Sequence, residues 1–184
     1  QGYYKRQFKA PKAAIAPYGE DARRVNPGGR PRLFVFVLGE TARAQSFSLG
    51  GYERATNPRL AREDIVYFSN ASSCGTATTI SVPCIFSGMT RAEYDPDVAR
   101  ARESLLDIAK RAGYQAHWLE NNTGCKGACD RIDVLRFSPE VAKKWCPEGG
   151  RDFCDDAALG EELGLLLARE APRDRIVVLH QIGS

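Results

Sequence analysis

Two short segments of this chain carry the residues that could do chemistry. Leu33–Leu38 is an apolar run that stops two residues before a carboxylate, Glu40, and Cys74–Cys84 is a hydroxyl-rich stretch with Thr78 near its middle. A neutral threonine hydroxyl is a poor nucleophile, but a divalent cation lowers the pKa of bound water from about 15.7 to about 7, and an alcohol responds similarly. The pattern allows a shared cation at Glu40 and Thr78, with Thr78 as nucleophile. The simpler alternative is an exposed loop carboxylate and a helix-capping threonine.

A second group of residues could hold a phosphate. Thr78 lies where a helix is expected to begin, and a helix N-terminus offers free N–H groups and a positive dipole to an anion. Lys126 lies inside Cys125–Cys129, and a disulfide there would demand a tight turn, because bonded cysteines rarely have Cα atoms more than about 6.8 Å apart. Such a turn would fix Lys126 as a point charge, with Asn122 and Thr123 beside it as hydrogen-bond donors. The alternative is an exposed loop lysine.

The two histidines of the chain are weaker candidates. His117 lies within an expected strand beside Trp118, and we interpret it as a packed, hydrogen-bonded core residue. His180 closes the last expected strand. His180 either contacts residues that bind the metal or substrate or merely ends the sheet, and we do not expect it to bind the metal.

The six cysteines fall into three close pairs, and pairing of nearest neighbours is the simplest of the many possibilities. A zinc cluster is the rival interpretation, but no pair has the two-residue gap typical of such sites. Disulfides would indicate an oxidising compartment. The cysteines are Cys74, Cys84, Cys125, Cys129, Cys146 and Cys154.

Composition indicates one globular domain, because the 184 residues are 43% hydrophobic and 27% charged. The net charge is only +3, and the scattered lysines and arginines do not suggest a nucleic-acid partner. Leu33–Leu38 is far shorter than the roughly 20 apolar residues that span a bilayer, and the sequence has no signal peptide. We therefore expect an oxidised domain whose upstream part is missing; the alternative is a reduced cytosolic protein whose cysteine spacing is accidental.

The order of elements predicts an α/β fold. Residues 1–31 are punctuated by proline and glycine and are expected to form an extended arm or linker, followed by a domain over residues 32–184. Strands alternating with helices predict a mostly parallel sheet with helices on both faces. The strands are expected at 32–38 (buried on both faces), 65–69, 114–119 and 175–180, the helices at 58–63, 78–87, 104–113 and 155–169, and a loop-rich region at 121–150. Since ligands gather beyond the carboxyl ends of such strands, a chain that stops at Ser184 is expected to be truncated within its domain.

Several motifs in a fixed order resemble those of one enzyme family, over the region from about Leu33 through Ser184. This family is the lipid A phosphoethanolamine transferases, which include the mobile colistin-resistance enzymes and belong to the alkaline-phosphatase and sulfatase superfamily. The matching motifs are Gly39-Glu-Thr-Ala-Arg43, Gly51-Tyr-Glu-Arg54 with Thr56-Asn-Pro58, Ser73-Cys-Gly-Thr-Ala-Thr78 with Ser81-Val-Pro-Cys84, Asn121-Asn122 with Cys125-Lys-Gly127, and His180-Gln-Ile-Gly-Ser184.

The resemblance implies an alkaline-phosphatase-like fold and a zinc cofactor, with Glu40 and Thr78 as zinc ligands. It implies that Thr78 attacks the phosphorus of phosphatidylethanolamine, releases diacylglycerol, and then passes phosphoethanolamine to a phosphate of lipid A. The cysteine pairs resemble the disulfides of the family. The positions that resemble substrate contacts are Lys126 and Asn122, and we expect Thr123 and Thr76 to bind the substrate with them.

The resemblance also implies a location and an incompleteness. The chain would be the N-terminal portion of the periplasmic catalytic domain of an inner-membrane protein from a Gram-negative bacterium, with membrane helices upstream that are absent here. The remaining zinc ligands of the family, an aspartate followed by a histidine, lie downstream, so we expect this chain alone to be inactive, with an unpaired sheet edge. The rivals are another superfamily enzyme such as a phosphoglycerol transferase, and a non-catalytic, disulfide-stapled envelope-binding domain. A sulfatase would need cysteine or serine in place of Thr78.

Overall fold

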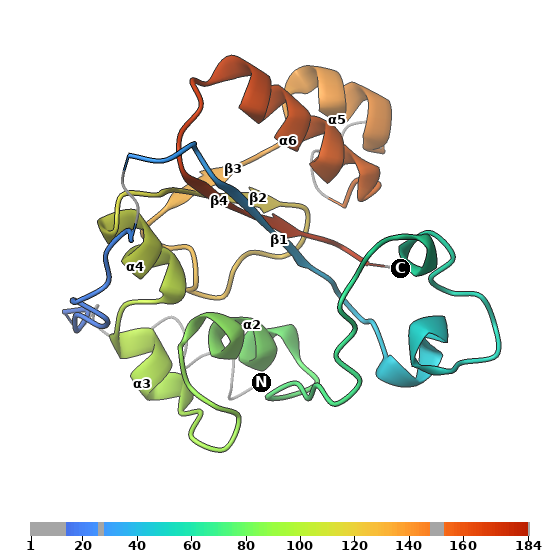
Figure 1. The fold of residues 1–184 in the computed structure, drawn as a ribbon, viewed down its shortest axis with the longest axis horizontal. Helices are drawn as coiled ribbons and strands as arrows, with labels where there is room; N and C mark the ends of the chain where they lie inside the picture. The colour runs from blue at the N-terminus through green and yellow to red at the C-terminus, as the bar shows by residue number, and fades with distance from the viewer. Residues whose placement is uncertain (1–13, 26–27, 148–152, 184) are drawn as a thin grey trace.

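A computed structural model describes residues 14–25, 28–147 and 153–183 of the chain (Figure 1). The parts of the predicted arm that cover residues 1–13 and 26–27 lie outside the described residues. Residues 14–25 lie against the domain: Ala16 forms a parallel bridge with Arg102, and the Arg111 guanidinium donates hydrogen bonds to the carbonyls of Tyr18 and Gly19.

A four-stranded sheet forms the centre of the fold. The strand order is β1 (Leu33–Leu38), β4 (Arg175–His180), β2 (Gln115–Glu120), β3 (Asp133–Leu135), and every pairing is parallel. The predicted parallel sheet is therefore confirmed. β4 is last in sequence but lies between β1 and β2, so the residues that follow these three strands meet at one edge of the sheet.

Helices cover both faces of this sheet, as predicted. Figure 1 shows α5 and α6 on one face, with α2, α3 and α4 on the other. One core cluster includes Phe86, Leu106 and Trp118, and the second includes Val141 and Leu159. The helices are α2 (Thr78–Phe86), α3 (Pro96–Ala101), α4 (Leu105–Arg111), α5 (Pro139–Trp145) and α6 (Ala157–Arg169), and the 3-10 helices are η1 (Ala44–Ser46), η2 (Ser48–Gly50) and η3 (Leu60–Arg62).

Local signals placed several of these elements correctly. α2 begins at Thr78. α4 begins after Ser104, which forms a capping box with Asp107, and is followed by Gly113 in the left-handed region at φ 93°. Residues 121–150, predicted to be loop-rich, also contain β3 and α5.

The prediction that β1 is buried on both faces is wrong. Its first five residues, Leu33 to Val37, are between 38% and 56% exposed, and only Leu38 is buried. Among the described residues β1 pairs with β4 alone and is therefore an edge strand. A continuous apolar run does not distinguish a central strand from an edge strand whose faces are only partly covered.

Two further predicted elements are absent from the described structure. Residues 65–69 do not form a strand, and Val66 and Phe68 are 80% and 77% exposed. A strand requires a partner for its backbone groups, and no described strand pairs with this segment. The helix predicted for residues 58–63 is reduced to the single turn η3, whose cap position, Arg59, forms no side-chain capping bond.

Candidate active site

The Thr78 hydroxyl and the Glu40 carboxylate lie in direct contact. Thr78 Oγ1 donates a hydrogen bond of 2.8 Å to Glu40 Oε2, and the Thr41 amide donates one of 3.2 Å to Glu40 Oε1. Both Glu40 and Thr78 are half-buried. The structure therefore brings together the carboxylate and the hydroxyl that the sequence singled out.

Local structure positions each member of this pair. Glu40 follows the carboxyl end of β1, where the Leu38 carbonyl accepts a 3.0 Å hydrogen bond from the Gln181 amide. Thr78 is the first residue of α2, and Ala77 occupies the cap position without a side-chain capping bond. The Thr78 hydroxyl is thus directed to Glu40 instead of serving as a helix cap.

The second predicted group, Asn122, Thr123 and Lys126, lies in the turn after β2. The Lys126 ammonium donates hydrogen bonds of 2.6 Å to the Thr123 carbonyl and 2.8 Å to the Thr123 hydroxyl. The Cys125–Cys129 disulfide closes this turn with a Cα–Cα distance of 5.7 Å, and Lys126 has a φ of 54°. A cation is therefore held in a tight turn at the carboxyl end of the sheet.

The turn after β4 connects the two groups. The Asn122 side-chain amide donates a 2.7 Å hydrogen bond to the Gln181 carbonyl, while the Gln181 amide is bonded to Leu38. Because β4 lies between β1 and β2, this turn is flanked by Glu40 on one side and by Asn122 on the other. Thr76 is exposed in the loop two residues before Thr78.

A buried carboxylate that the sequence analysis did not identify supports this edge of the sheet. Glu120 is 2% exposed and accepts hydrogen bonds from Trp118 Nε1 at 2.8 Å and from the Asn122 amide at 2.6 Å. His180 Nδ1 lies 3.0 Å from Glu120 Oε1. Burial opposes the charged form of Glu120, but the hydrogen bonds from His180, Trp118 and the Asn122 amide outweigh it and lower the pKa of this carboxyl. An acidic residue directly after a predicted strand was the available signal.

The two histidines differ in their surroundings. His180 is fully buried, and its Nε2 has no hydrogen-bond partner among the described residues. His117 is packed, as expected, at 5% exposure, but neither of its ring nitrogens is hydrogen-bonded to any part of the chain that the structure describes. The expectation of a hydrogen-bonded His117 is therefore wrong, and burial lowers the pKa of its imidazole.

Three disulfides brace the loops around these residues. Cys74–Cys84 ties the loop before α2 to the helix itself, Cys125–Cys129 encloses Lys126, and Cys146–Cys154 joins the end of α5 to the segment before α6. Each short bridge stabilises the fold by roughly 2–3 kcal/mol, chiefly by restricting the unfolded chain.

Glu40 and Thr78 together are fewer ligands than a zinc site requires. Zinc is usually bound by four ligands, or by three protein ligands and a water in catalytic sites. Within residues 14–25, 28–147 and 153–183, no three histidine, cysteine, aspartate or glutamate side chains lie close enough together to hold a metal ion. A carboxylate and a hydroxyl are nevertheless suitable oxygen donors for a divalent ion.

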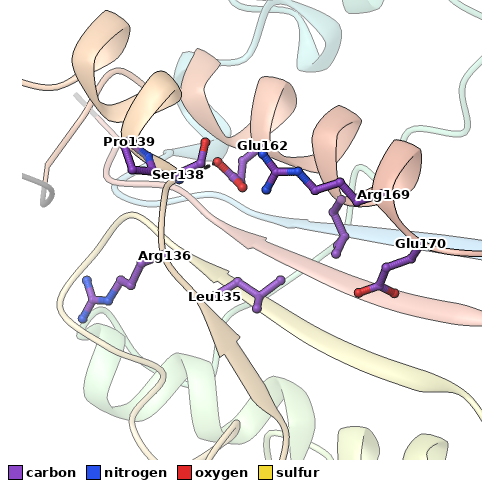
Figure 2. A pocket seen from close by; sticks show the side chains of 8 residues that line it. Leu135, Arg136, Ser138, Pro139, Glu162, Arg169 and Glu170 are labelled. Carbon is purple, nitrogen blue, oxygen red and sulfur yellow. Dashed lines mark hydrogen bonds between the residues drawn. The ribbon is translucent and has the colours of Figure 1, made fainter.

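A hollow of about 380 Å³ lies elsewhere, beside α5 and α6 (Figure 2). The buried Glu162 carboxylate accepts a 2.8 Å hydrogen bond from the Ser138 amide at this place. The lining residues are Leu135, Arg136, Ser138, Pro139, Glu162, Leu166, Arg169 and Glu170. None of the predicted site residues is among them, so the candidate chemistry is located on the loops at the carboxyl edge of the sheet.

Sequence comparison identifies longer relatives. Phosphoethanolamine transferase EptA of Salmonella typhimurium is 46% identical over 170 residues, which are 90% of this chain and 30% of the relative. Phosphatidylethanolamine transferase Mcr-1 of Escherichia coli is 38% identical over 184 residues, which are 97% of this chain and 34% of the relative. The chain thus spans about a third of the length of these curated relatives.

None of the helices in the described part of the chain has the length and apolar character needed to cross a bilayer. Solved structures share the fold of this chain. The soluble domain of lipooligosaccharide phosphoethanolamine transferase A from Neisseria meningitidis aligns with a TM-score of 0.82 at 35% identity, over 95% of this chain and 52% of that one. The periplasmic domain of EptC from Escherichia coli, solved in complex with Zn, aligns with a TM-score of 0.66 at 22% identity, over 86% and 45%. The Sulfatase family model matches residues 32–184, and the chain therefore belongs to the sulfatase family.

Proposed function

We propose that this chain is part of the catalytic domain of a transferase that moves phosphoethanolamine from phosphatidylethanolamine to a phosphate of lipid A. The observation that carries the proposal is the 2.8 Å hydrogen bond between the Thr78 hydroxyl and the Glu40 carboxylate at the carboxyl edge of a parallel sheet. The names of the relatives, which are phosphoethanolamine and phosphatidylethanolamine transferases, support the choice of transferred group.

In the first half-reaction, Thr78 Oγ1 attacks the phosphorus of the donor lipid. A bond forms between this oxygen and phosphorus, the bond from phosphorus to the diacylglycerol oxygen breaks, and the hydroxyl proton leaves with diacylglycerol as its new hydroxyl. In the second half-reaction, an oxygen of a singly protonated phosphate of lipid A forms a bond to the same phosphorus, the bond from phosphorus to Thr78 Oγ1 breaks, and the proton of the acceptor phosphate passes to Thr78. Before the attack Glu40 orients the hydroxyl, because its Oε2 accepts the hydrogen bond from Thr78.

Zinc suits this chemistry, with Glu40 and Thr78 among its ligands and the others supplied from outside this chain. When bound, the ion would lower the pKa of the Thr78 hydroxyl and so increase the fraction of nucleophilic alkoxide. This role agrees with the oxygen donors present and with the low histidine content of the chain.

The donor phosphate would be held by the second group of residues. Lys126 supplies a positive charge, and its hydrogen bonds to Thr123 fix the direction of its side chain. Asn122, Thr123 and Thr76 supply hydrogen-bond donors, and the N-terminus of α2 adds a favourable dipole.

The setting we propose is the periplasm, on a protein anchored in the inner membrane of a Gram-negative bacterium through a region outside this chain. Three disulfides suit an oxidising compartment. In the domain organisation we propose, residues 1–31 form the connecting arm and residues 32–184 form part of the catalytic domain.

Mass spectrometry of lipid A from cells that express the intact gene product tests the proposal. We expect lipid A to gain phosphoethanolamine, and Thr78→Ala to reduce the modification by about 10³-fold or more, since it removes the nucleophile. Thr90→Ala makes the same substitution at an exposed threonine bonded to Glu93 and should keep the wild-type level. Addition of phosphoglycerol to lipid A would favour the alternative function, a phosphoglycerol transferase. Wild-type levels of lipid A modification by Thr78→Ala would refute the role of Thr78.

A further inference from the structure

Asp156 occupies a helix cap position but does not cap its helix. It immediately precedes α6, and its side chain makes no capping hydrogen bond. The neighbouring Asp155 takes that role, because its Oδ1 accepts a 2.8 Å hydrogen bond from the Ala157 amide. Aspartate is favoured at this position for the capping bond itself, so the different orientation of Asp156 requires another explanation.

The Asp156 carboxylate instead binds the turn after β4. Its Oδ1 accepts a 2.9 Å hydrogen bond from the Ile182 amide, and its Oδ2 accepts one of 3.2 Å from the Gly183 amide. Oδ1 also accepts a 2.8 Å hydrogen bond from the side-chain amide of Asn121. Two consecutive backbone amides are thus held by one carboxylate.

Asn121 anchors this arrangement to a disulfide. The Asn121 side chain is buried, donates a 2.8 Å hydrogen bond to the Cys154 carbonyl and accepts one of 2.9 Å from the Cys154 amide. Cys154 is bonded to Cys146 and is 1% exposed. The carboxylate of Asp156 is therefore fixed by groups that are themselves immobilised in the core.

The turn that Asp156 holds packs closely against Glu40. Gly183 has a φ of 72°, and a Cβ atom at this position would lie 2.9 Å from the Glu40 carbonyl oxygen, 3.1 Å from Glu40 Cβ and 3.0 Å from Thr41 Oγ1. Such distances leave no space between the turn and Glu40. Figure 1 shows the same relation in outline, with the C-terminal end of the described chain beside the loops that follow β1.

We propose that Asp156 is a positioning residue, which holds the Ile182–Gly183 turn against Glu40 and thereby fixes the carboxylate that orients Thr78. This inference deepens the proposed function and rests on it for its catalytic consequence. Removal of the Asp156 carboxylate leaves two amides without their acceptor, so the turn relaxes away from Glu40. A misplacement of about 1 Å in an active site can cost about 10²-fold in rate.

The structural arm of the test uses the intact gene product and three variants: Asp156→Ala, Asp156→Asn and the control Asp155→Ala. Asp155→Ala removes an equal charge from the same helix end without touching the turn. By NMR, we expect faster amide exchange at Ile182 and Gly183 and shifted signals of Glu40 and Thr41 in Asp156→Ala but not in Asp155→Ala. Asn keeps one acceptor oxygen but places an NH₂ group before the second amide, so its effect should be intermediate.

The kinetic arm measures phosphoethanolamine transfer by the intact gene product. In Asp156→Ala we expect kcat to fall by about 10- to 100-fold with KM changed by less than about 3-fold, while Asp155→Ala stays within about 2-fold of wild type. Equal losses in the two alanine variants, or Glu40 signals unmoved by Asp156→Ala, would overturn the positioning role. If the wild-type protein transfers no phosphoethanolamine, the proposed function fails, and the NMR arm alone decides whether Asp156 positions Glu40.

Discussion

Replacement of Glu120 by glutamine should destabilise the fold by more than its conservative shape suggests. Three donors converge on this buried carboxylate: Trp118 Nε1, the Asn122 amide and His180 Nδ1. Glutamine retains one acceptor oxygen and places an NH₂ group at the position of the other. If the retained oxygen serves Asn122 and His180, the indole N–H of Trp118, which is fully buried, loses its acceptor.

The magnitude follows from these contacts. An unsatisfied buried donor costs about 1–3 kcal/mol, and the two remaining hydrogen bonds lose the strength that a charged acceptor gives them. Together these effects amount to about 3 kcal/mol of unfolding free energy, or a fall in Tm of about 6–12 °C for a chain of this size. Urea unfolding with an unchanged m-value measures the first quantity, and calorimetry measures the second.

The pH dependence gives this prediction a second readout. The pKa of Glu120 is lower in the folded than in the unfolded chain, so its contribution is complete above the unfolded pKa, about 4.3, and is lost as pH falls through the folded value. The difference in unfolding free energy between wild type and Glu120→Gln should therefore be constant above about pH 5.5 and shrink below about pH 4. A difference that stays equal at both ends of this range would refute the reasoning.

Glu161→Gln is the matched control. Glu161 also accepts a hydrogen bond from a tryptophan, Trp145 Nε1 at 2.7 Å, and pairs with Lys144 at 2.7 Å, but its side chain is 36% exposed. Water can replace its contacts, so we expect Tm to fall by less than about 2 °C.

Two further substitutions test the packing around the site. His117→Leu should remove a loss of stability that the wild-type chain shows as pH falls below about 6.5. Burial lowers the pKa of His117, so the unfolded state binds the proton more readily. Between about pH 7.5 and about pH 5, the unfolding free energy should therefore fall less in the variant than in the wild-type chain. Gly183→Ala should lower the unfolding free energy by about 1–3 kcal/mol, because a Cβ at φ 72° meets the Glu40 backbone. In the control Gly160→Ala in α6, nothing lies within 4 Å of the new Cβ, so the unfolding free energy should rise by about 0.5–1 kcal/mol. Equal effects of the two substitutions would contradict the close approach of Gly183 to Glu40.

Elements with strong local signals could be predicted from the sequence. The apolar runs located β1 and β4, Ser104 and Gly113 bounded α4, and the hydroxyl-rich loop located the start of α2 at Thr78. These signals depend on residues within a few positions of one another, which is the range over which propensity and capping act.

The environment of each element could not be predicted in the same way. β1 has the composition of a central strand, yet its exposure depends on β4, which arrives from the other end of the chain. The segment at 65–69 has strand-forming residues but no partner among the described strands. Strand propensity describes a side chain that fits a pleated surface and does not specify the neighbour that creates that surface.

Residues that support the candidate site from a distance in sequence were missed for the same reason. Asp156 follows the local rule for an acidic residue at a helix start, so the sequence offered no cause to look further. Its contacts with Ile182 and Gly183 span 26 and 27 residues, and the contact of Glu120 with His180 spans 60. A pattern read over one helical turn contains no information about such pairs.

The order of the strands explains why the candidate site depends on the end of the described chain. Glu40 and Thr78 both precede β2 in sequence, yet the turn that flanks Glu40 follows β4. Insertion of β4 between β1 and β2 therefore brings the Gln181 backbone to Leu38 and to Asn122 at once. Before that step Glu40 has only its hydrogen bonds with Thr41 and Thr78 to orient it. The geometry of the pair should thus form late in folding, after the long-range closure that places β4, because the entropy of closing that loop must be overcome first.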